Sequence, residues 1–353
     1  MLNITKYIMA ISAFFIASSS YAASALDVSP ICKTVGKDLD SFISRGSHCL
    51  MSEQREIALT DAQGLNVGTA KVTAYVYSDN PKNALTWTYK YKLRTQIIGK
   101  PGESVKVRPE LYCYECTVKT VYGNPINLVN GLSAESTTTF TPSKASLATS
   151  NPLFLSPSVS FQVAKVKESF DNAGYLDPGL YNPSVRCDIG KAKLNTQGCV
   201  YPNAPAIMTT IKLTDPDVDE SAKHIKEAFL AGKPGEFIAS APNSLFRTSN
   251  STPLHRLRDA GTRKEHRAIS VKNCKAKYGP TVGSKCFFTG DSDEVATDCD
   301  CDEFPFAATK EGGADASVKK IDASDNRRAG ARLGAFFSAE RVLDEDEFFL
   351  KVD

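Results

Sequence analysis

Residues 298–306 read DCDCDEFPF, and residues 317–337 read SVKKIDASDNRRAGARLGAFF. Four carboxylates crowd into the first stretch: Asp298, Asp300, Asp302 and Glu303. Carboxylates this close together repel one another unless a cation or a basic partner neutralises them. The C-terminal part of the chain is therefore expected to hold positive charge at this point.

The residues around this acidic stretch predict two strands followed by a helix. Residues 304–309 (FPFAAT) predict a buried strand, Glu311-Gly312-Gly313 a turn, and Ser317–Ile321 a second strand. Ser324 is expected to cap a helix that runs to about Phe337. Apolar residues at helical spacing give this helix one buried face: Ala329, Leu333, Phe336 and Phe337.

The same helix carries an amide and two glycines. Gly330 and Gly334 each cost about 1 kcal/mol relative to alanine in a helix, which predicts that another backbone approaches closely there. Asn326 lies near the start of the apolar stripe and is either a residue of the cap or a metal ligand. An acidic hairpin followed by a helix with an asparagine can hold one hard divalent cation through oxygen atoms. The run lacks the D-x-D-x-D-G order of an EF-hand calcium loop.

A basic stretch precedes the acidic one. Between residues 247 and 278, basic side chains greatly outnumber Asp259 and Glu265. Such a run is either a solvated face or, in an enzyme acting on a polyanion, the place where phosphates dock. Candidate phosphate contacts in it are Arg256, Arg258, Arg263 and Arg267. A divalent ion beside a phosphodiester stabilises the leaving oxygen while a carboxylate deprotonates the attacking water.

The histidines are interpreted as structural or solvated. His255 and His266 lie in the basic stretch, where contact with DNA is the less favoured alternative. His224 lies beside the apolar face of a predicted helix, Glu220–Leu230, which Asp219 or Ser221 can cap.

The first half of the chain predicts an all-β, antiparallel sandwich-like domain. Trp87, Tyr89, Tyr91 and Leu93 alternate with polar residues, as in a strand with one buried face. Residues 70–78 form a hairpin with that strand, and residues 105–121 and 159–166 add further strands. Its aromatic residues are interpreted as core, and no catalytic constellation stands out.

Length, composition and charge exclude several classes of protein. The length of 353 residues suggests two domains, and 42% hydrophobic with 23% charged residues excludes a mostly disordered or fibrous chain. A net charge of +2 excludes a general polycation. Residues 1–22 are typical of a cleaved signal peptide, and all ten cysteines follow it, which predicts disulfides and a secreted or periplasmic protein.

The chain is expected to divide into four parts. A β-rich domain spans 23–175, and a C-terminal domain of mixed helices and strands spans 207–353. Between them, residues 176–206 are rich in Pro, Gly and Asn and are predicted to be a connector with its own disulfide, Cys187 to Cys199. The signal peptide is the fourth part.

Several ordered motifs of the C-terminal part resemble the secreted bacterial NucA/NucB deoxyribonucleases. Residues 300–307 (DCDEFPFA) are similar to the D-x-D-E-[WFY]-P-x-A signature of that family. Its E-G-G, A-S-V and [DE]-N-R-x-A-G motifs are matched at 311–313, 316–318 and 325–330. Residues 223–228 and 341–352 resemble an early helix and the closing strand, so the resemblance covers about 205–353.

The resemblance implies a ββα-metal core, like that of His–Me finger nucleases, with an acidic residue in place of the general-base histidine. Asp302 and Glu303 become the base and the metal-side carboxylate, in an order that stays open, and Asn326 becomes a ligand or an orienting amide. Arg327 becomes a phosphate contact, with Arg328 beside it. Glu311 becomes a residue that contacts other site residues and helps to hold them in place. Cys301 stands where short members carry a basic residue, so one phosphate contact of the family is not carried over to this chain, and Cys301 is expected in a disulfide that fixes the hairpin.

The main hypothesis is therefore an exported endonuclease, dependent on Mg²⁺ or Mn²⁺, that hydrolyses DNA phosphodiesters with little sequence preference. No stable membrane association is expected after signal cleavage, and the oligomeric state is open. The alternative is a secreted binding or adhesion protein whose nuclease-like domain is degenerate and keeps only structural calcium.

Overall fold

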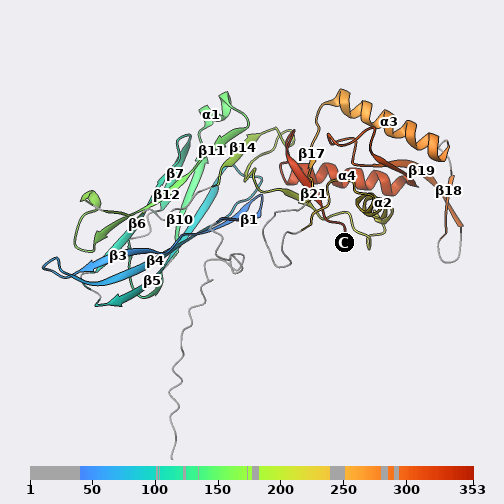
Figure 1. The fold of residues 1–353 in the computed structure, drawn as a ribbon. Helices are drawn as coiled ribbons and strands as arrows, with labels where there is room; N and C mark the ends of the chain where they lie inside the picture. Colours follow the sequence, from blue (N-terminus) through green and yellow to red (C-terminus); the bar gives the residue numbers. More distant parts are fainter. Residues whose placement is uncertain are drawn as a thin grey trace, which may run out of the picture.

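The structure of the protein is a computed structural model that describes residues 40–100, 102, 104–121, 125–133, 135–172, 174–176, 183–238, 251–279, 285–289 and 294–353. These residues form two lobes, an N-terminal one dominated by strands and a C-terminal one that mixes strands with long helices (Figure 1). The predicted signal peptide lies outside the described residues. Within the described part, no helix is both long and apolar enough to cross a membrane.

Short helical turns and many strands make up the N-terminal lobe. In chain order these are β1 (Asp40–Ser44), β2 (Ser47–Met51), β3 (Arg55–Thr60), β4 (Asn66–Asp79), β5 (Trp87–Gly99), β6 (Val105–Tyr112), β7 (Cys116–Val121), β8 (Ile126–Asn127), β9 (Gly131–Leu132), β10 (Ser136–Pro142), α1 (Lys144–Thr149), β11 (Leu153–Leu155), β12 (Ser158–Lys165), the 3₁₀ turn η2 (Phe170–Asn172) and β13 (Gly174–Leu176). The larger sheet has the order β1-β2-β4-β5-β10-β7, with β3 and β9 at its margins, and a second sheet has the order β13-β12-β6-β8.

The two sheets share one hydrophobic core, which confirms the predicted sandwich-like packing. Trp87, Tyr89, Tyr91 and Leu93 of β5 are each 1% exposed or less. They pack in one cluster with Val107 of β6 and Phe161 of β12 from the second sheet. The predicted hairpin is also present, because β4 pairs antiparallel with β5. Alternating burial along a strand thus places these aromatic rings inside the lobe.

The segment predicted as a connector packs on the N-terminal lobe. β14 (Val185–Ile189) pairs with β11 and with β15 (Gln197–Val200), and the predicted disulfide joins Cys187 to Cys199. Val185, Tyr201 and Ala204 belong to the N-terminal core. The core of the C-terminal lobe begins at Ala206. Residues 183–204 are therefore part of the first lobe rather than a separate link.

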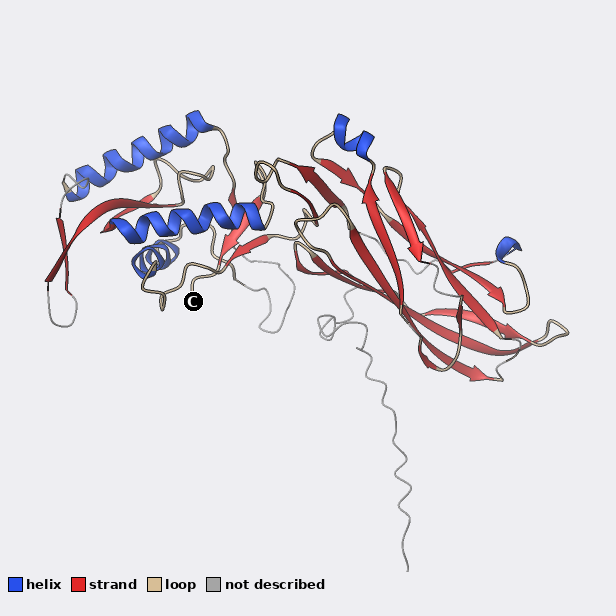
Figure 2. Cartoon of the chain, turned by 180° about the vertical axis from the view of Figure 1, so that it is seen from behind, coloured by secondary structure: helices blue, strands red, loops and turns tan. Residues whose placement is uncertain are grey.

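The C-terminal lobe is built around a hairpin between helices. Its elements are β16 (Ala206–Met208), α2 (Asp219–Leu230), β17 (Leu254–His255), α3 (Ala260–Tyr278), β18 (Lys285–Thr289), β19 (Glu294–Phe304), β20 (Ser317–Asp322), α4 (Ala323–Ala339) and β21 (Glu347–Leu350). β19 pairs antiparallel with both β18 and β20. In both views the hairpin lies between α3 on one side and α2 with α4 on the other (Figures 1 and 2). A small sheet, β16-β21-β17, lies at the end of this lobe that faces the N-terminal lobe.

The order of two strands and a helix matches the prediction, but three boundaries differ. The acidic run lies inside β19, and the strand ends at Phe304, so the expected strand over 304–309 is wrong. A proline at 305 has no N–H to donate to a neighbouring strand, which favours an end to the ladder there. The side chain of Asp322, not that of Ser324, caps α4 by accepting from Ser324 N and Asp325 N. The closing strand is limited to Glu347–Leu350.

The glycines of α4 do not admit a second backbone as predicted, whereas Gly313 does lie in a turn as predicted. A Cβ atom added at Gly330 or Gly334 would meet nothing within 4 Å, so among the described residues no other segment's backbone packs against that side of either glycine. At Gly313, φ is +90° and a Cβ atom would lie 2.8 Å from Cδ2 of His266. The turn between β19 and β20 therefore needs glycine at this position.

Candidate active site

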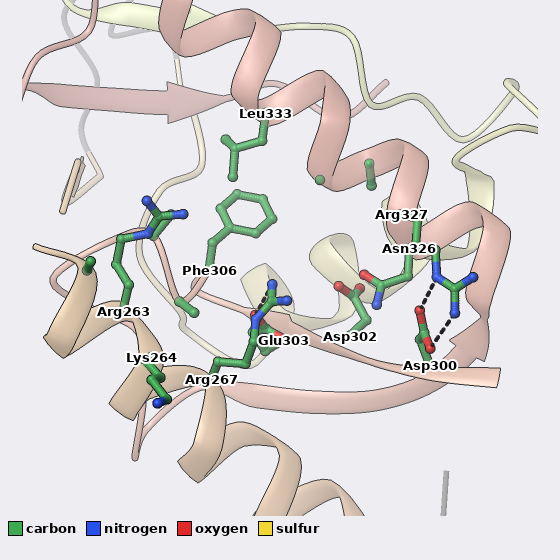
Figure 3. Close-up of a pocket in the computed structure, with 15 residues that line it drawn as sticks. Arg263, Lys264, Arg267, Asp300, Asp302, Glu303, Phe306, Asn326, Arg327 and Leu333 are labelled. Atoms are coloured by element: carbon green, nitrogen blue, oxygen red, sulfur yellow. Dashed lines mark hydrogen bonds and ion pairs between the residues drawn. The ribbon is translucent and has the colours of Figure 1, made fainter. Parts of the chain in front are cut away.

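A cleft of about 680 Å³ opens between α3, the end of β19 and the first turns of α4 (Figure 3). Its polar lining comes from Arg263, Lys264 and Arg267 of α3, from Asp300, Asp302 and Glu303 of β19, and from Asn326 and Arg327 of α4. Apolar side chains such as Phe306 and Leu333 cover the rest. The cleft thus brings one acidic and one basic group of side chains together.

The carboxylates of Asp302 and Glu303 form the acidic part. Asp302 is 5% exposed, and its Oδ2 atom lies 2.8 Å from Nδ1 of His224. Burial and the adjacent charge of Asp302 raise the pKa of Glu303 to about 7, although Arg267 acts in the opposite direction. A carboxyl group with this pKa can exchange a proton near neutral pH.

Asn326 contributes an amide from the first turn of α4. Its Nδ2 atom donates to the carbonyl of Cys301 at 3.3 Å, so the amide is anchored to β19, and within the described part of the chain Oδ1 has no hydrogen-bond donor. Figure 3 shows Asp302 and Asn326 pointing into the same part of the cleft. The next residue, Arg327, is 70% exposed and is held by Asp300, with Nε at 3.0 Å from Oδ2.

The basic wall is one face of α3. Arg267 is 73% exposed, and its Nη2 atom lies 3.8 Å from Oε1 of Glu303. The disulfide between Cys274 and Cys301 fastens α3 to β19 at the residue that precedes Asp302. The structure confirms that Cys301 is in a disulfide. Because of this link, the basic helix and the acidic strand keep their relative positions.

Four other predicted site residues do not line the cleft: Arg256, Arg258, Arg328 and Glu311. The guanidinium of Arg256 lies 4.4 Å from the ring centre of Phe337 and donates to the carbonyl of Val342. Burial, with the charges of Arg258 and Arg263, lowers the pKa of Arg256 to about 10. This arginine is therefore half-buried against the lobe.

The remaining three make contacts elsewhere. Nη1 of Arg258 donates to the carbonyl of Lys191 in the N-terminal lobe at 2.5 Å. Nη1 of Arg328 lies 2.7 Å from Oδ1 of Asp217. Glu311 accepts from the backbone N of His255 at 3.0 Å, and its other oxygen lies 2.7 Å from Nδ1 of the same residue. These contacts stabilise the lobe and its junction with the first lobe.

The donor set of the cleft fits a hard divalent cation. Among the described residues, no group of three or more His, Cys, Asp and Glu side chains is arranged to hold a metal ion. The cleft offers the oxygens of Asp302, Glu303 and Asn326, and Mg²⁺ is commonly bound through one or two carboxylates while it keeps several waters. Burial first, and then the charge of Asp302, raise the pKa of Glu303, so a cation bound here would favour the ionised form of this carboxyl group.

Sequence reasoning missed one residue that lines the cleft and one that contacts a cleft carboxylate from behind it. Lys264 lines the cleft, and its place in the basic stretch was the available signal. His224 contacts Asp302 although the two residues are far apart in the sequence, and no local pattern indicated that contact.

The match with a known family agrees with this geometry. Residues 247–351 match the family model of deoxyribonuclease NucA/NucB. The C-terminal lobe thus carries a NucA/NucB domain, and DNA is the substrate that such a domain implies. No curated protein matches the chain. The matched range begins at 247, so α2 and the N-terminal lobe lie outside it, although the sequence resemblance was traced from about 205.

Proposed function

We propose that this protein is an exported, divalent-metal-dependent endonuclease that hydrolyses phosphodiester bonds of DNA with little sequence preference. One observation carries the proposal. Two carboxylates and an asparagine amide share a cleft with exposed arginines, within the region that matches the NucA/NucB deoxyribonucleases. The disulfides support export, since such bonds persist in oxidising compartments.

The cations around the cleft are proposed to hold the DNA backbone. Arg263, Lys264, Arg267 and Arg327 line it. Contacts of this kind neutralise phosphates and fix the position of the strand, but they carry no sequence information. The proposed set replaces Arg256, Arg258 and Arg328 with Lys264, because those three side chains do not line the cleft and Lys264 does.

The proposed chemistry is in-line attack of water on phosphorus. Asp302 or Glu303 accepts a proton of the water, the new P–O bond forms, and the bond to the 3′ oxygen breaks. The leaving 3′ oxygen takes a proton from solvent water, and the products are a 5′ phosphate and a 3′ hydroxyl. Mg²⁺ or Mn²⁺ held by Asp302, Glu303 and Asn326 would stabilise negative charge on the phosphate oxygens. In this proposal β19, β20 and α4 correspond to a ββα-metal core in which a carboxylate replaces the general-base histidine.

Cleavage of a supercoiled plasmid tests the proposal. The purified protein should nick and then linearise the plasmid with Mg²⁺ or Mn²⁺, should lose this activity in EDTA, and should regain it when metal is added back. Plasmids of different sequence should be cut at similar rates. DNA binding without cleavage under any of these metals would instead favour the alternative of a non-catalytic binding protein.

A further inference from the structure

His224 is the one histidine that contacts an acidic residue of the cleft among the residues that the structure describes. It belongs to α2, outside the range that matches the NucA/NucB family, and is 1% exposed. Its Nδ1 atom lies 2.8 Å from Oδ2 of Asp302, and its Nε2 atom lies 3.0 Å from Oγ of Ser317. Both ring nitrogens are therefore engaged.

The contact with Asp302 selects one tautomer of a neutral ring. A carboxylate oxygen only accepts, so Nδ1 must carry the hydrogen that is donated to Asp302. Nε2 is then an acceptor, and the hydroxyl of Ser317 can donate to it. Asp302 thus selects the tautomer, the hydroxyl of Ser317 holds the ring at Nε2, and the carboxylate continues to line the cleft.

The helix that carries His224 is fastened to the helix that carries Asn326. The carboxylate of Asp325 accepts from the backbone N of Glu220 at 3.0 Å and of Ser221 at 3.4 Å. In return, Glu220 Oε2 accepts from the backbone N of Asp322 at 2.7 Å. The first turns of α2 and α4 therefore satisfy each other's free N–H groups.

A single hydrogen-bond network consequently fixes the positions of two proposed catalytic residues, Asp302 and Asn326. From α4 it passes through Asp325 to α2, and from α2 through His224 to Asp302 on β19. Asn326 directly follows Asp325 and is itself bonded to the carbonyl of Cys301 on β19. A shift of α2 would therefore disturb the positions of both Asp302 and Asn326.

We propose that His224 is a positioning residue, which orients the carboxylate of Asp302 through Nδ1–H while Ser317 holds the ring at Nε2. This inference rests on the proposed function. Substitution of a buried partner that orients a reactive ligand typically costs about 10–100-fold in activity or metal affinity. The same loss is expected here, with little change in the affinity for DNA, since His224 does not line the cleft.

Kinetic comparison of variants tests the inference. His224→Leu should lower kcat about 10–100-fold at saturating metal while KM for DNA changes less than about twofold. His224→Asn should recover most of kcat, because its amide can donate in place of Nδ1–H. His255→Leu is the matched control, since His255 also pairs with a carboxylate, Glu311, outside the cleft. Equal losses in the Leu and Asn variants at position 224, or in the control, would contradict the inference.

A spectroscopic measurement keeps the test independent of activity and of one variant's folding. Two-dimensional ¹⁵N NMR of histidine-labelled, full-length protein should show His224 with the hydrogen on Nδ1, and Ser317→Ala should change that signal. A hydrogen on Nε2 of a neutral His224 ring would overturn the proposal. An inactive wild-type protein with the expected tautomer would overturn the deoxyribonuclease assignment and leave the hydrogen bond to Asp302 established.

Discussion

Arg341 of the C-terminal lobe donates to Asp188 of the N-terminal lobe, from Nε to Oδ2 at 2.8 Å and from Nη2 to Oδ1 at 2.5 Å. The two side chains are 2% and 0% exposed. Beside them, Asp346 accepts from Arg45 and Arg186 of the N-terminal lobe, each at less than 3 Å. The lobes are thus joined through charges that are paired away from water, and separating them would leave those charges without partners.

Removing one partner of the buried pair should destabilise the protein. Asp188→Ala leaves the guanidinium of Arg341 buried and unpaired, so the free energy of unfolding should fall by about 3–5 kcal/mol. Urea denaturation followed by circular dichroism measures this. The control is Asp217→Ala, which breaks the exposed pair with Arg328 and should cost less than about 1 kcal/mol. Similar losses in both variants would show that the junction contributes no special stability.

The junction should also weaken in acid. Burial alone would raise the pKa of Asp346, but its hydrogen bonds to Arg186 and the charges of Arg45 and Arg186 lower it below the ordinary 3.8. A carboxyl group with a lower pKa in the folded state stabilises the protein above its unfolded pKa, and this stabilisation is lost as the pH falls through the folded value. Urea midpoints measured from pH 6 down to pH 2 should fall more steeply for the wild type than for Asp346→Asn. Parallel curves would contradict the assignment.

The phosphate contacts can be assigned by salt dependence. Arg263→Gln should weaken DNA binding about equally for unrelated sequences and should lower the slope of log K against log salt by about 0.9. Arg328→Gln removes an equal charge from the same lobe, but its guanidinium contacts Asp217 and does not line the cleft. The slope should therefore stay unchanged in that variant. Fluorescence anisotropy of a labelled duplex at several salt concentrations gives both slopes.

Space beside α4 offers a steric test of the cleft. Gly330 lines the cleft and Gly334 does not, although a Cβ atom added at either position would meet open space. Gly330→Phe should therefore fold and should lower the DNA cleavage rate about tenfold or more by misplacing the bound strand. Gly334→Phe, one turn along the same helix, should leave the rate nearly unchanged. Equal activity in both variants would place the DNA elsewhere.

The spacing of apolar residues and the order of the motifs are visible in the sequence, and most of the strands and helices could be predicted from them. The alternation around Trp87 predicted a strand with one buried face, and the stripe from Ala329 to Phe337 predicted the helix. Strand limits were harder to place, because the charges of residues 298–303 are unusual in a strand while the apolar residues 304–309 are typical of one. The structure continues β19 through the acidic run and ends it before Pro305.

Long-range contacts decided which candidate side chains reach the cleft. Arg256 and Arg263 belong to one basic stretch, yet Arg256 packs on Phe337 while Arg263 lines the cleft. His224 and Asp302 meet only because α2 packs against the hairpin. A pattern along the chain shows local periodicity and charge. Neither of them tells which distant helix or strand a given side chain will contact.

Loss of activity in nearly isosteric variants tests the central claim most directly. Plasmid cleavage by wild-type protein, Asp302→Asn and Glu303→Gln would be compared with Mg²⁺ and with Mn²⁺, after circular dichroism has shown that all three are folded. We expect each variant to lose about 100-fold or more of the rate, since each removes a charge that the chemistry needs. Full activity in both single variants would contradict the assignment of this cleft as the catalytic site.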